Sequence, residues 1–271
     1  MYKIIFFDLD GTLLDEKKEV LEESKMAIEK VKKSGVEVVL CSGRQKNAVE
    51  RYKRIADTGR YIISTNGAEI YDFEAKKVIL EIGMDKNASK WLCEIALRNK
   101  YLLRVDTKIA RYINNLKYRI NDEILLEEDI EKFIDNNQIL QISIGTKEEK
   151  EIDQIIKKLK GMLAVKIINK YYVTFNGISL WIINVANEKV SKGNAVLYLC
   201  QYLNINSKEA MAFGDGKNDI SMLRAVGCGI AMGNASTEVK KVAREVIGIN
   251  EEASIAKALN KFIINNSDSK I

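Results

Sequence analysis

The amino-acid sequence predicts an α/β protein in which a parallel-sheet core is interrupted by a smaller inserted α+β domain. Strands and helices alternate over about the first 64 residues and again from about residue 185, which is typical of a parallel sheet. Between these parts the strands come in closely spaced groups, which is typical of an antiparallel sheet. We therefore predict a discontinuous core at residues 1–84 and 185–271 and an inserted domain at residues 85–184.

Apolar runs and helical spacing predict the elements of the core. Residues 4–7 (IIFF) are bounded by polar residues and predict a buried strand, although so short a run does not by itself exclude a helix. Residues 17–33 place apolar side chains on one helical face, and Gly35 follows as a stop. The other expected core elements are strands at 36–40, 61–64, 210–213 and 229–232, and helices at 45–57, 192–203, 217–225 and from about 235.

The inserted domain has a different order and spacing of helices and strands. Its longer periodic segments predict three helices, and its β-branched and aromatic runs predict five strands. The helices are expected at 86–99, 127–135 and 148–160, and the strands at 101–106, 110–114, 138–146, 165–176 and 179–185.

Composition narrows the chemistry and the partners. The chain has no histidine, so acid–base work falls to carboxylates, lysine, tyrosine or water, and its four cysteines form no CxxC pair. The net charge of +5 is spread out, without a dense basic run, so we expect no nucleic-acid partner.

No apolar run approaches the ~18 residues of a membrane span. The first residues, MYKIIFFD, reach an acid too early for a signal peptide, so a cytoplasmic protein is expected.

Polar residues and glycines follow the expected core strands. In an open parallel sheet, ligands bind outside the carboxyl ends of the strands. Asp8 would end a buried strand close to Asp10, and burying such carboxylates costs several kcal/mol unless a cation or hydrogen bonds compensate. The other strand ends carry Ser42-Gly43-Arg44, Thr65-Asn66-Gly67, Gly214–Asp219 and Gly233-Asn234.

Four motifs resemble those of the haloacid dehalogenase (HAD) superfamily of aspartate-nucleophile phosphatases. They are DLDGT at 8–12, CSGR at 41–44, VSKGNA at 190–195 and GDGKND at 214–219. Within the superfamily the chain resembles the Cof-like group, which has an α/β cap inserted between the second and third motifs. The resemblance implies a Rossmann-like parallel-sheet core with that cap. The cap itself is matched by position and rhythm only.

The resemblance also implies a mechanism and a set of site residues. Asp8 would attack phosphorus to form an aspartyl-phosphate, while Asp10 would act as general acid and base. Mg²⁺ would be held by Asp8, the backbone carbonyl of Asp10, and Asp215, with Asp219 either a direct ligand or a support. Phosphate would contact Thr12, Ser42, Gly43, Lys192 and Asn218, and substrate would contact Arg44, Thr65 and Asn66.

Several alternatives stay open on sequence alone. Arg44 could contact substrate, pair with an acid of the core or lie in solvent, and Thr65, Asn66 and Asn234 could be simple turn formers. The expected activity is hydrolysis of small phosphorylated metabolites, with sugar phosphates first and flavin mononucleotide or pyridoxal phosphate also considered. The alternatives are a phosphosugar mutase of the same superfamily and a non-catalytic metabolite-binding protein. The sequence does not decide between a monomer and a homodimer.

Overall fold

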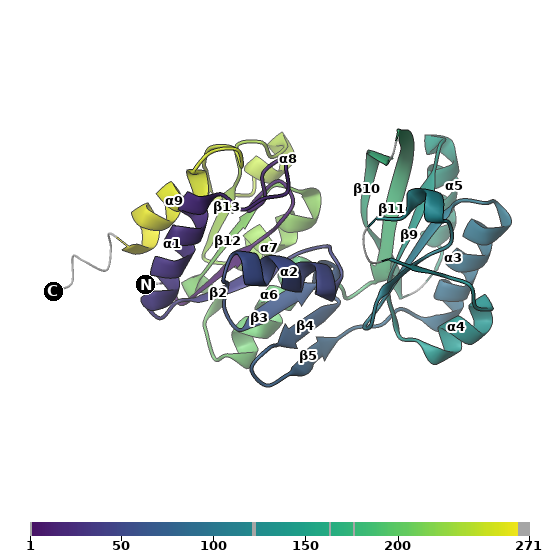
Figure 1. Ribbon diagram of the computed structural model, residues 1–271, viewed down its shortest axis with the longest axis horizontal. Helices are drawn as coiled ribbons and strands as arrows, with labels where there is room; N and C mark the ends of the chain where they lie inside the picture. Colours follow the sequence, from purple (N-terminus) through teal and green to yellow (C-terminus); the bar gives the residue numbers. More distant parts are fainter. Residues whose placement is uncertain (1, 121–122, 163, 176, 265–271) are drawn as a thin grey trace. The chain divides into compact units, whose positions relative to one another are not determined.

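The computed structural model describes residues 2–120, 123–162, 164–175 and 177–264. The last residue of the strand expected at 165–176, together with residues 1 and 265–271 of the expected core, lies outside the described residues. The chain divides into two compact units (Figure 1). The first consists of the chain up to Leu80 and from Ser191 onward, and the second is Glu81–Val190.

The first unit contains a sheet with the strand order β14-β13-β12-β1-β2-β3-β4-β5. Neighbouring strands from β14 to β3 are parallel, and β4 pairs antiparallel with β3. This architecture confirms the predicted α/β class with a parallel-sheet core. The strands are β1 (Ile4–Phe7), β2 (Glu37–Cys41), β3 (Tyr61–Ser64), β4 (Glu69–Asp72), β5 (Lys77–Glu81), β12 (Ala210–Gly214), β13 (Cys228–Ala231) and β14 (Glu245–Val246).

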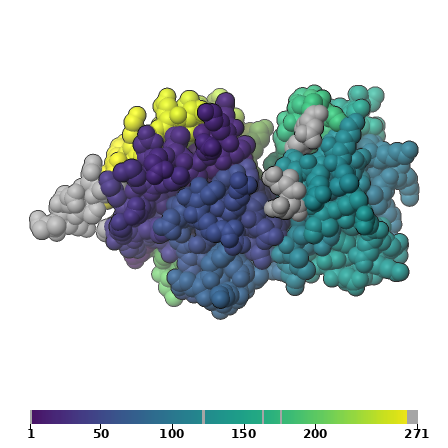
Figure 2. Space-filling model, in the orientation of Figure 1, coloured from purple at the N-terminus to yellow at the C-terminus, as the bar shows by residue number. Residues whose placement is uncertain are grey.

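Helices cover both faces of this sheet. Ile5 and Phe7 of β1 pack with α1, α2 and α9, whereas Ile4 and Phe6 pack with α6, α7 and α8. All four side chains are fully buried, as expected for a central parallel strand. Helices α1 and α9 come from opposite ends of the chain and lie side by side (Figures 1 and 2). The helices are α1 (Glu22–Lys33), α2 (Lys46–Ile55), α6 (Lys192–Tyr202), α7 (Ile220–Ala225), α8 (Thr237–Lys240) and α9 (Ser254–Leu259).

Three parts of the core differ from the sequence prediction. The helix expected from residue 17 begins at Glu22, because the preceding segment folds back and Val20 bridges to Leu14. The helix expected from about 235 is the single short α8, followed by β14 and α9. The pair β4 and β5, which extends the sheet beyond β3, was not predicted.

The second unit has its own sheet and core. Its strand order is β10-β11-β9-β6-β7-β8, and the pairs are antiparallel except the parallel pair β7 and β8. Apolar side chains of one sheet face pack with the three helices. The elements are α3 (Lys86–Arg98), β6 (Leu102–Thr107), β7 (Arg111–Ile113), β8 (Ile124–Leu125), α4 (Ile130–Asn136), β9 (Ile139–Thr146), α5 (Glu149–Leu159), β10 (Val165–Phe175) and β11 (Ile178–Asn187).

The alternation along β6 sorts polar from apolar residues in this second sheet. Leu103 and Val105 belong to the core under the helices, whereas Arg104 and Asp106 alternate with them and are buried in ion pairs. The sheet face away from the helices therefore carries buried ion pairs beside a small apolar cluster that includes Leu102, Leu180 and Ile182. In neither unit does a helix of the described residues combine the length and the apolar character needed to cross a bilayer.

Candidate active site

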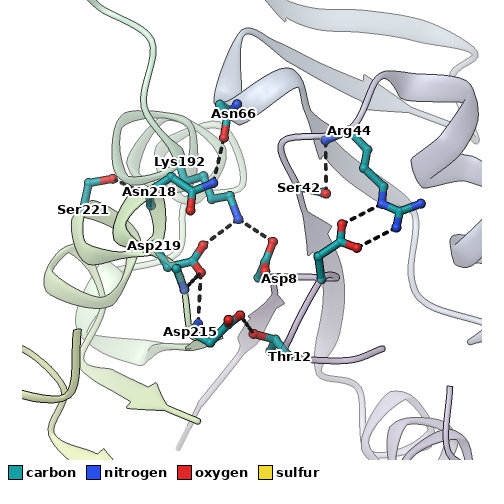
Figure 3. Close-up of polar contacts among 12 residues, drawn as sticks. Asp8, Thr12, Ser42, Arg44, Asn66, Lys192, Asp215, Asn218, Asp219 and Ser221 are labelled. Atoms are coloured by element: carbon teal, nitrogen blue, oxygen red, sulfur yellow. Dashed lines mark hydrogen bonds and ion pairs between the residues drawn. The ribbon is translucent and has the colours of Figure 1, made fainter. Parts of the chain in front are cut away.

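The carboxyl ends of the core strands bring most of the predicted site residues together (Figure 3). Asp8 directly follows β1, Ser42 follows β2, and Asp215 follows β12. Lys192 is the first residue of α6 and also reaches this edge. Because parallel strands end on the same side of a sheet, residues that are far apart in the sequence become neighbours here.

A buried lysine links two buried aspartates at the centre of the site. Lys192 Nζ lies 2.5 Å from Asp8 Oδ1 and 2.5 Å from Asp219 Oδ1. Lys192 is 1% exposed and Asp219 is fully buried, so solvent screens these charges little. Burial and the Asp219 carboxylate raise the pKa of Asp8, and Lys192 opposes that rise.

Close backbone packing places Lys192. Ser191 caps α6, since its side chain accepts a hydrogen bond from the Asn194 N–H. Gly67 has a φ of +97°, and a Cβ added there would lie 2.4 Å from the Ser191 carbonyl oxygen. On the other side, the Gly193 N–H donates to Ser221 Oγ at 3.1 Å. The start of α6 is thus held between the turn that contains Gly67 and the first residues of α7.

Asp219 uses both carboxylate oxygens within the protein. Oδ1 pairs with Lys192, and Oδ2 accepts hydrogen bonds from the N–H groups of Asp215 at 3.0 Å and Gly216 at 2.8 Å. Its contacts therefore fix both the lysine and the loop that carries Asp215 (Figure 3).

Asp215 and Thr12 close the site on the side of the first motif. Thr12 Oγ1 donates to Asp215 Oδ1 at 2.7 Å. Burial raises the pKa of Asp215 to about 6, with Thr12 opposing the shift and the Asp219 carboxylate adding to it. Gly11 has a φ of +80°, and a Cβ there would lie 2.3 Å from Asp215 Oδ2, so the approach of the two loops requires glycine.

The acidic side chains are close enough to share a cation. Asp8, Asp215 and Asp219 can each offer one carboxylate oxygen, and these three atoms lie within 4.8 Å of one another. The pKa values of Asp8 and Asp215 are raised because both carboxylates are buried beside other carboxylates. The donor set is all oxygen and suits a hard divalent cation such as Mg²⁺.

Asp10 pairs with Arg44. The guanidinium donates from Nε to Asp10 Oδ2 at 2.7 Å and from Nη2 to Oδ1 at 2.6 Å, and Lys18 Nζ donates to Oδ1 at 3.0 Å. Burial would raise the pKa of Asp10, but Arg44 and Lys18 outweigh it and lower the pKa to about 2. Of the three possibilities that the sequence left for Arg44, the structure shows the pairing with an acid of the core.

The remaining predicted residues form a hydrogen-bonded rim. Asn218 Nδ2 donates to Asn66 Oδ1 at 2.9 Å, the Asn66 N–H donates to the Ser42 carbonyl at 2.9 Å, and the Arg44 N–H donates to Ser42 Oγ at 3.2 Å. Gly43 lies against Asn66, since a Cβ there would be 3.0 Å from Asn66 Oδ1. Thr65 and Asn66 have φ values of 49° and 58°, so both are also turn formers.

Sequence reasoning missed two supporting residues and left a third open. Lys18, which contacts Asp10, and Ser221, which contacts the start of α6, belong to no recognisable pattern. Asn234 donates from Nδ2 to the Gly11 carbonyl at 2.8 Å and so ties the last strand-end loop to the first. A polar residue after each strand was the signal for Asn234, and no comparable signal exists for the other two.

Comparison with known proteins identifies the family. The family model for haloacid dehalogenase-like hydrolases matches residues 5–259, so the chain belongs to this family. The resemblance drawn from the four motifs is thereby confirmed.

Individual relatives match over nearly their whole length. YxeH of Bacillus subtilis is 29% identical over 97% of this chain and 99% of that protein. The 5-amino-6-(5-phospho-D-ribitylamino)uracil phosphatase YcsE of Bacillus subtilis is 26% identical over 97% and 96%. The solved structure of BT1666 from Bacteroides thetaiotaomicron, studied among phosphatases of the superfamily, has a TM-score of 0.78 and 26% identity over 97% and 95%. The comparisons support a phosphatase.

Proposed function

We propose that this protein is a magnesium-dependent phosphatase that hydrolyses small phosphorylated metabolites through an aspartyl-phosphate intermediate. The observation that carries the proposal is the buried group of Asp8, Lys192 and Asp219 beside Asp215 at the carboxyl edge of the sheet. A carboxylate nucleophile, a fixed cation and an oxygen-rich cation site are thus gathered where a parallel sheet binds ligands.

Asp8 is the proposed nucleophile. Lys192 holds Oδ1, whereas Oδ2 accepts no hydrogen bond from any residue that the structure describes. Attack by this oxygen forms a bond to phosphorus while the bond from phosphorus to the leaving oxygen breaks, and the leaving oxygen takes a proton. Water then attacks the aspartyl-phosphate, which releases inorganic phosphate and restores Asp8.

Asp10 is the proposed proton carrier, and its contact with Arg44 determines which step it can serve. Ionised Asp10 can take a proton from the attacking water, which is the base half of its role. The acid half requires a protonated carboxyl group, which the pairing with Arg44 disfavours. We therefore propose that Asp10 separates from Arg44 before it protonates the leaving group.

The carboxylates of Asp8 and Asp215 and the backbone carbonyl of Asp10 are the proposed ligands of Mg²⁺. The ion would neutralise charge around the transferred phosphoryl group. Asp219 acts as a support in this proposal, since both its oxygens are engaged by Lys192 and by the loop N–H groups. Thr12, Ser42, Gly43, Lys192 and Asn218 are the proposed phosphate contacts, and Arg44, Thr65 and Asn66 the proposed contacts on the substrate side.

Sugar phosphates are the leading substrate class. Asn66, one of the proposed contacts on the substrate side, lies beside the proposed phosphate contacts Ser42 and Asn218, and an amide group at this position suits a hydroxyl-rich leaving group. The relative YcsE carries in its name a phosphorylated ribityl chain, which is also a small polyol phosphate.

The test is phosphate release from a panel of sugar phosphates, nucleotides and cofactor phosphates, with Mg²⁺ or with chelator. Asp8→Asn keeps the shape and removes the nucleophile, so release should fall at least about 10³-fold. Asp135→Asn, an exposed ion-pair residue of the second unit, is the surface control and should leave release unchanged. Release that survives in Asp8→Asn contradicts the mechanism, and transfer to substrate without free phosphate indicates a mutase.

A further inference from the structure

A cavity of about 460 Å³ lies at the opposite edge of the core sheet from the candidate active site. It is lined by residues at the amino ends of β2 and β3, including Glu37 and Arg60, by Lys53 near the end of α2, and by Phe73 after β4. Its volume is in the range of small-molecule sites. No residue of the proposed catalytic site lines it.

One of the cations that line the cavity takes part in no ion pair with the residues that the structure describes. Arg60 is held by Asp72 at 2.6 Å and by Glu74 at 2.8 Å, and Lys32 is held by Asp57 at 2.6 Å. Lys53, in contrast, has no carboxylate within 4.0 Å among the residues that the structure describes. Its ammonium group lies 4.8 Å from the centre of the Phe73 ring.

The surroundings of Lys53 favour an anionic guest. Burial lowers the pKa of Lys53 and the neighbouring charge of Lys32 lowers it further, while the smaller effects of nearby carboxylates such as Asp57 and Glu37 oppose the shift without cancelling it. An anion between the two lysines would relieve both effects. Charge-assisted hydrogen bonds that a partly desolvated ammonium group donates to an anion are among the stronger polar contacts.

Thr58 supplies a second, independent observation. Its side chain is 2% exposed and lines the cavity, yet its hydroxyl has no hydrogen-bond partner among the described residues. A buried hydroxyl without a partner costs free energy. The loop that carries it is fixed, because the Gly59 N–H donates to the Val38 carbonyl at 2.8 Å and the Arg60 N–H donates to Glu37 Oε1 at 2.7 Å.

We propose that this cavity is a second ligand site, separate from the catalytic one, that binds a small molecule through an anionic phosphate or carboxylate group. Lys53 contributes the charge and Thr58 a hydrogen bond, while Phe73 provides an apolar wall for the rest of the ligand. The proposal does not depend on the proposed catalytic function, since none of its residues belongs to that site.

The test follows backbone amide signals of the full-length protein by NMR during titration with inorganic phosphate and, separately, with succinate. The signals of Gly35, Gly59 and Arg60 should shift in a saturable manner, which locates binding at the cavity and separates it from phosphate binding near Asp8. A response to phosphate alone identifies a phosphate ligand, and a response to succinate alone identifies a carboxylate ligand. If neither probe shifts these signals to saturation, the proposal is wrong.

Two variants sharpen this test. Lys53→Gln should weaken binding of the responding probe about tenfold. Thr58→Val preserves the shape and should weaken it about fivefold without loss of stability, since the hydroxyl has no partner to lose. The matched control is Lys30→Gln, which removes an equal charge from an exposed position of α1 outside the cavity and should leave the affinity unchanged. Equal affinities in Lys53→Gln and Lys30→Gln would overturn the proposal.

Discussion

At the scale of single residues, Lys192 depends on its two carboxylate partners. Burial alone lowers the pKa of a lysine, but Asp219 and Asp8 outweigh it and raise the pKa of Lys192 above its ordinary value. Isolated buried charges are unstable, whereas this group keeps each charge in contact with an opposite one. The stability of this group and the proposed chemistry therefore depend on the same side chain.

Removing that side chain should affect both properties. Lys192→Met keeps much of the side-chain volume but leaves two buried carboxylates without their cation, so the free energy of unfolding at neutral pH should fall by about 3–5 kcal/mol. Phosphate release should be lost with it. Urea unfolding measures the first effect, and the phosphate assay measures the second.

The control for this prediction is Lys257→Met, at an exposed position of α9, which should change the free energy of unfolding by at most about 0.5 kcal/mol. If Lys192→Met were as stable as this control, the two carboxylates would not need a cation in the folded protein.

The residues of the candidate site were largely predictable from the sequence, but the contacts between their side chains were predictable to a smaller extent. Asp8 and Asp215 follow from motifs at strand ends, because a parallel sheet places such residues at one edge, and Lys192 follows from a motif at the start of a helix. The contact between Asp10 and Arg44 could not be derived, since a long flexible side chain has several partners within reach. The support of α6 by Ser221 likewise depends on the packing of α6 against α7.

At the scale of elements, short buried strands were predicted well because each is an apolar run between polar ends. The strand YIIS at 61–64 has the predicted bounds. The start of α1 was predicted too early because Val20 is buried in a bridged turn, and a buried turn residue can match helical spacing by chance. Strand β4 was missed because its buried positions include the acids Glu69 and Asp72, and β5 was missed because it is largely exposed and carries no polar–apolar alternation.

Two glycines with positive φ give a matched test of loop packing. Gly35 has a φ of +84° and open space around an added Cβ, so Gly35→Ala should cost only about 1 kcal/mol of backbone strain. Gly67 has a similar φ, but its added Cβ would meet the Ser191 carbonyl at 2.4 Å. Gly67→Ala should therefore cost about 1–3 kcal/mol more.

The Gly67→Ala change should also displace the start of α6 and lower the rate of phosphate release, whereas Gly35→Ala should not. Urea unfolding and the phosphate assay on both variants check this prediction. Equal stability losses in the two variants would mean that the Gly67 loop moves away from Ser191 without cost.

The end of β4 carries an ion pair whose contribution should depend on pH. Arg60 lowers the pKa of Asp72 below 3.8 through hydrogen bonds. Because the folded pKa is below the unfolded one, the stabilisation is present above the unfolded pKa and is lost as the pH falls through the folded pKa. Arg60→Gln should therefore lower the midpoint of urea unfolding at pH 7, and its difference from wild type should shrink below about pH 4. A difference that stays constant down to pH 2 would contradict this origin.

At the scale of the whole molecule, the chain is a discontinuous core with a unit inserted between β5 and α6. The inserted unit, Glu81–Val190, has its own apolar core and pairs all six strands of its sheet internally. We propose that it is the cap of the enzyme and governs access to the site, as lids commonly do. A unit of this kind should be able to change position without unfolding. This requires that it be stable without contacts to the core.

This independence can be measured because both tryptophans, Trp91 and Trp181, lie in the inserted unit. A fragment of residues 81–190 should fold alone and unfold in urea in one cooperative transition. Its midpoint by tryptophan fluorescence should agree with the midpoint by the same signal in the full chain, since that signal reports only on this unit. Far-UV circular dichroism of the full chain records the core as well and provides the internal control. A fragment without a cooperative transition, or with a much lower midpoint than the full chain, would show that the unit depends on the core, and a freely moving cap would then be excluded.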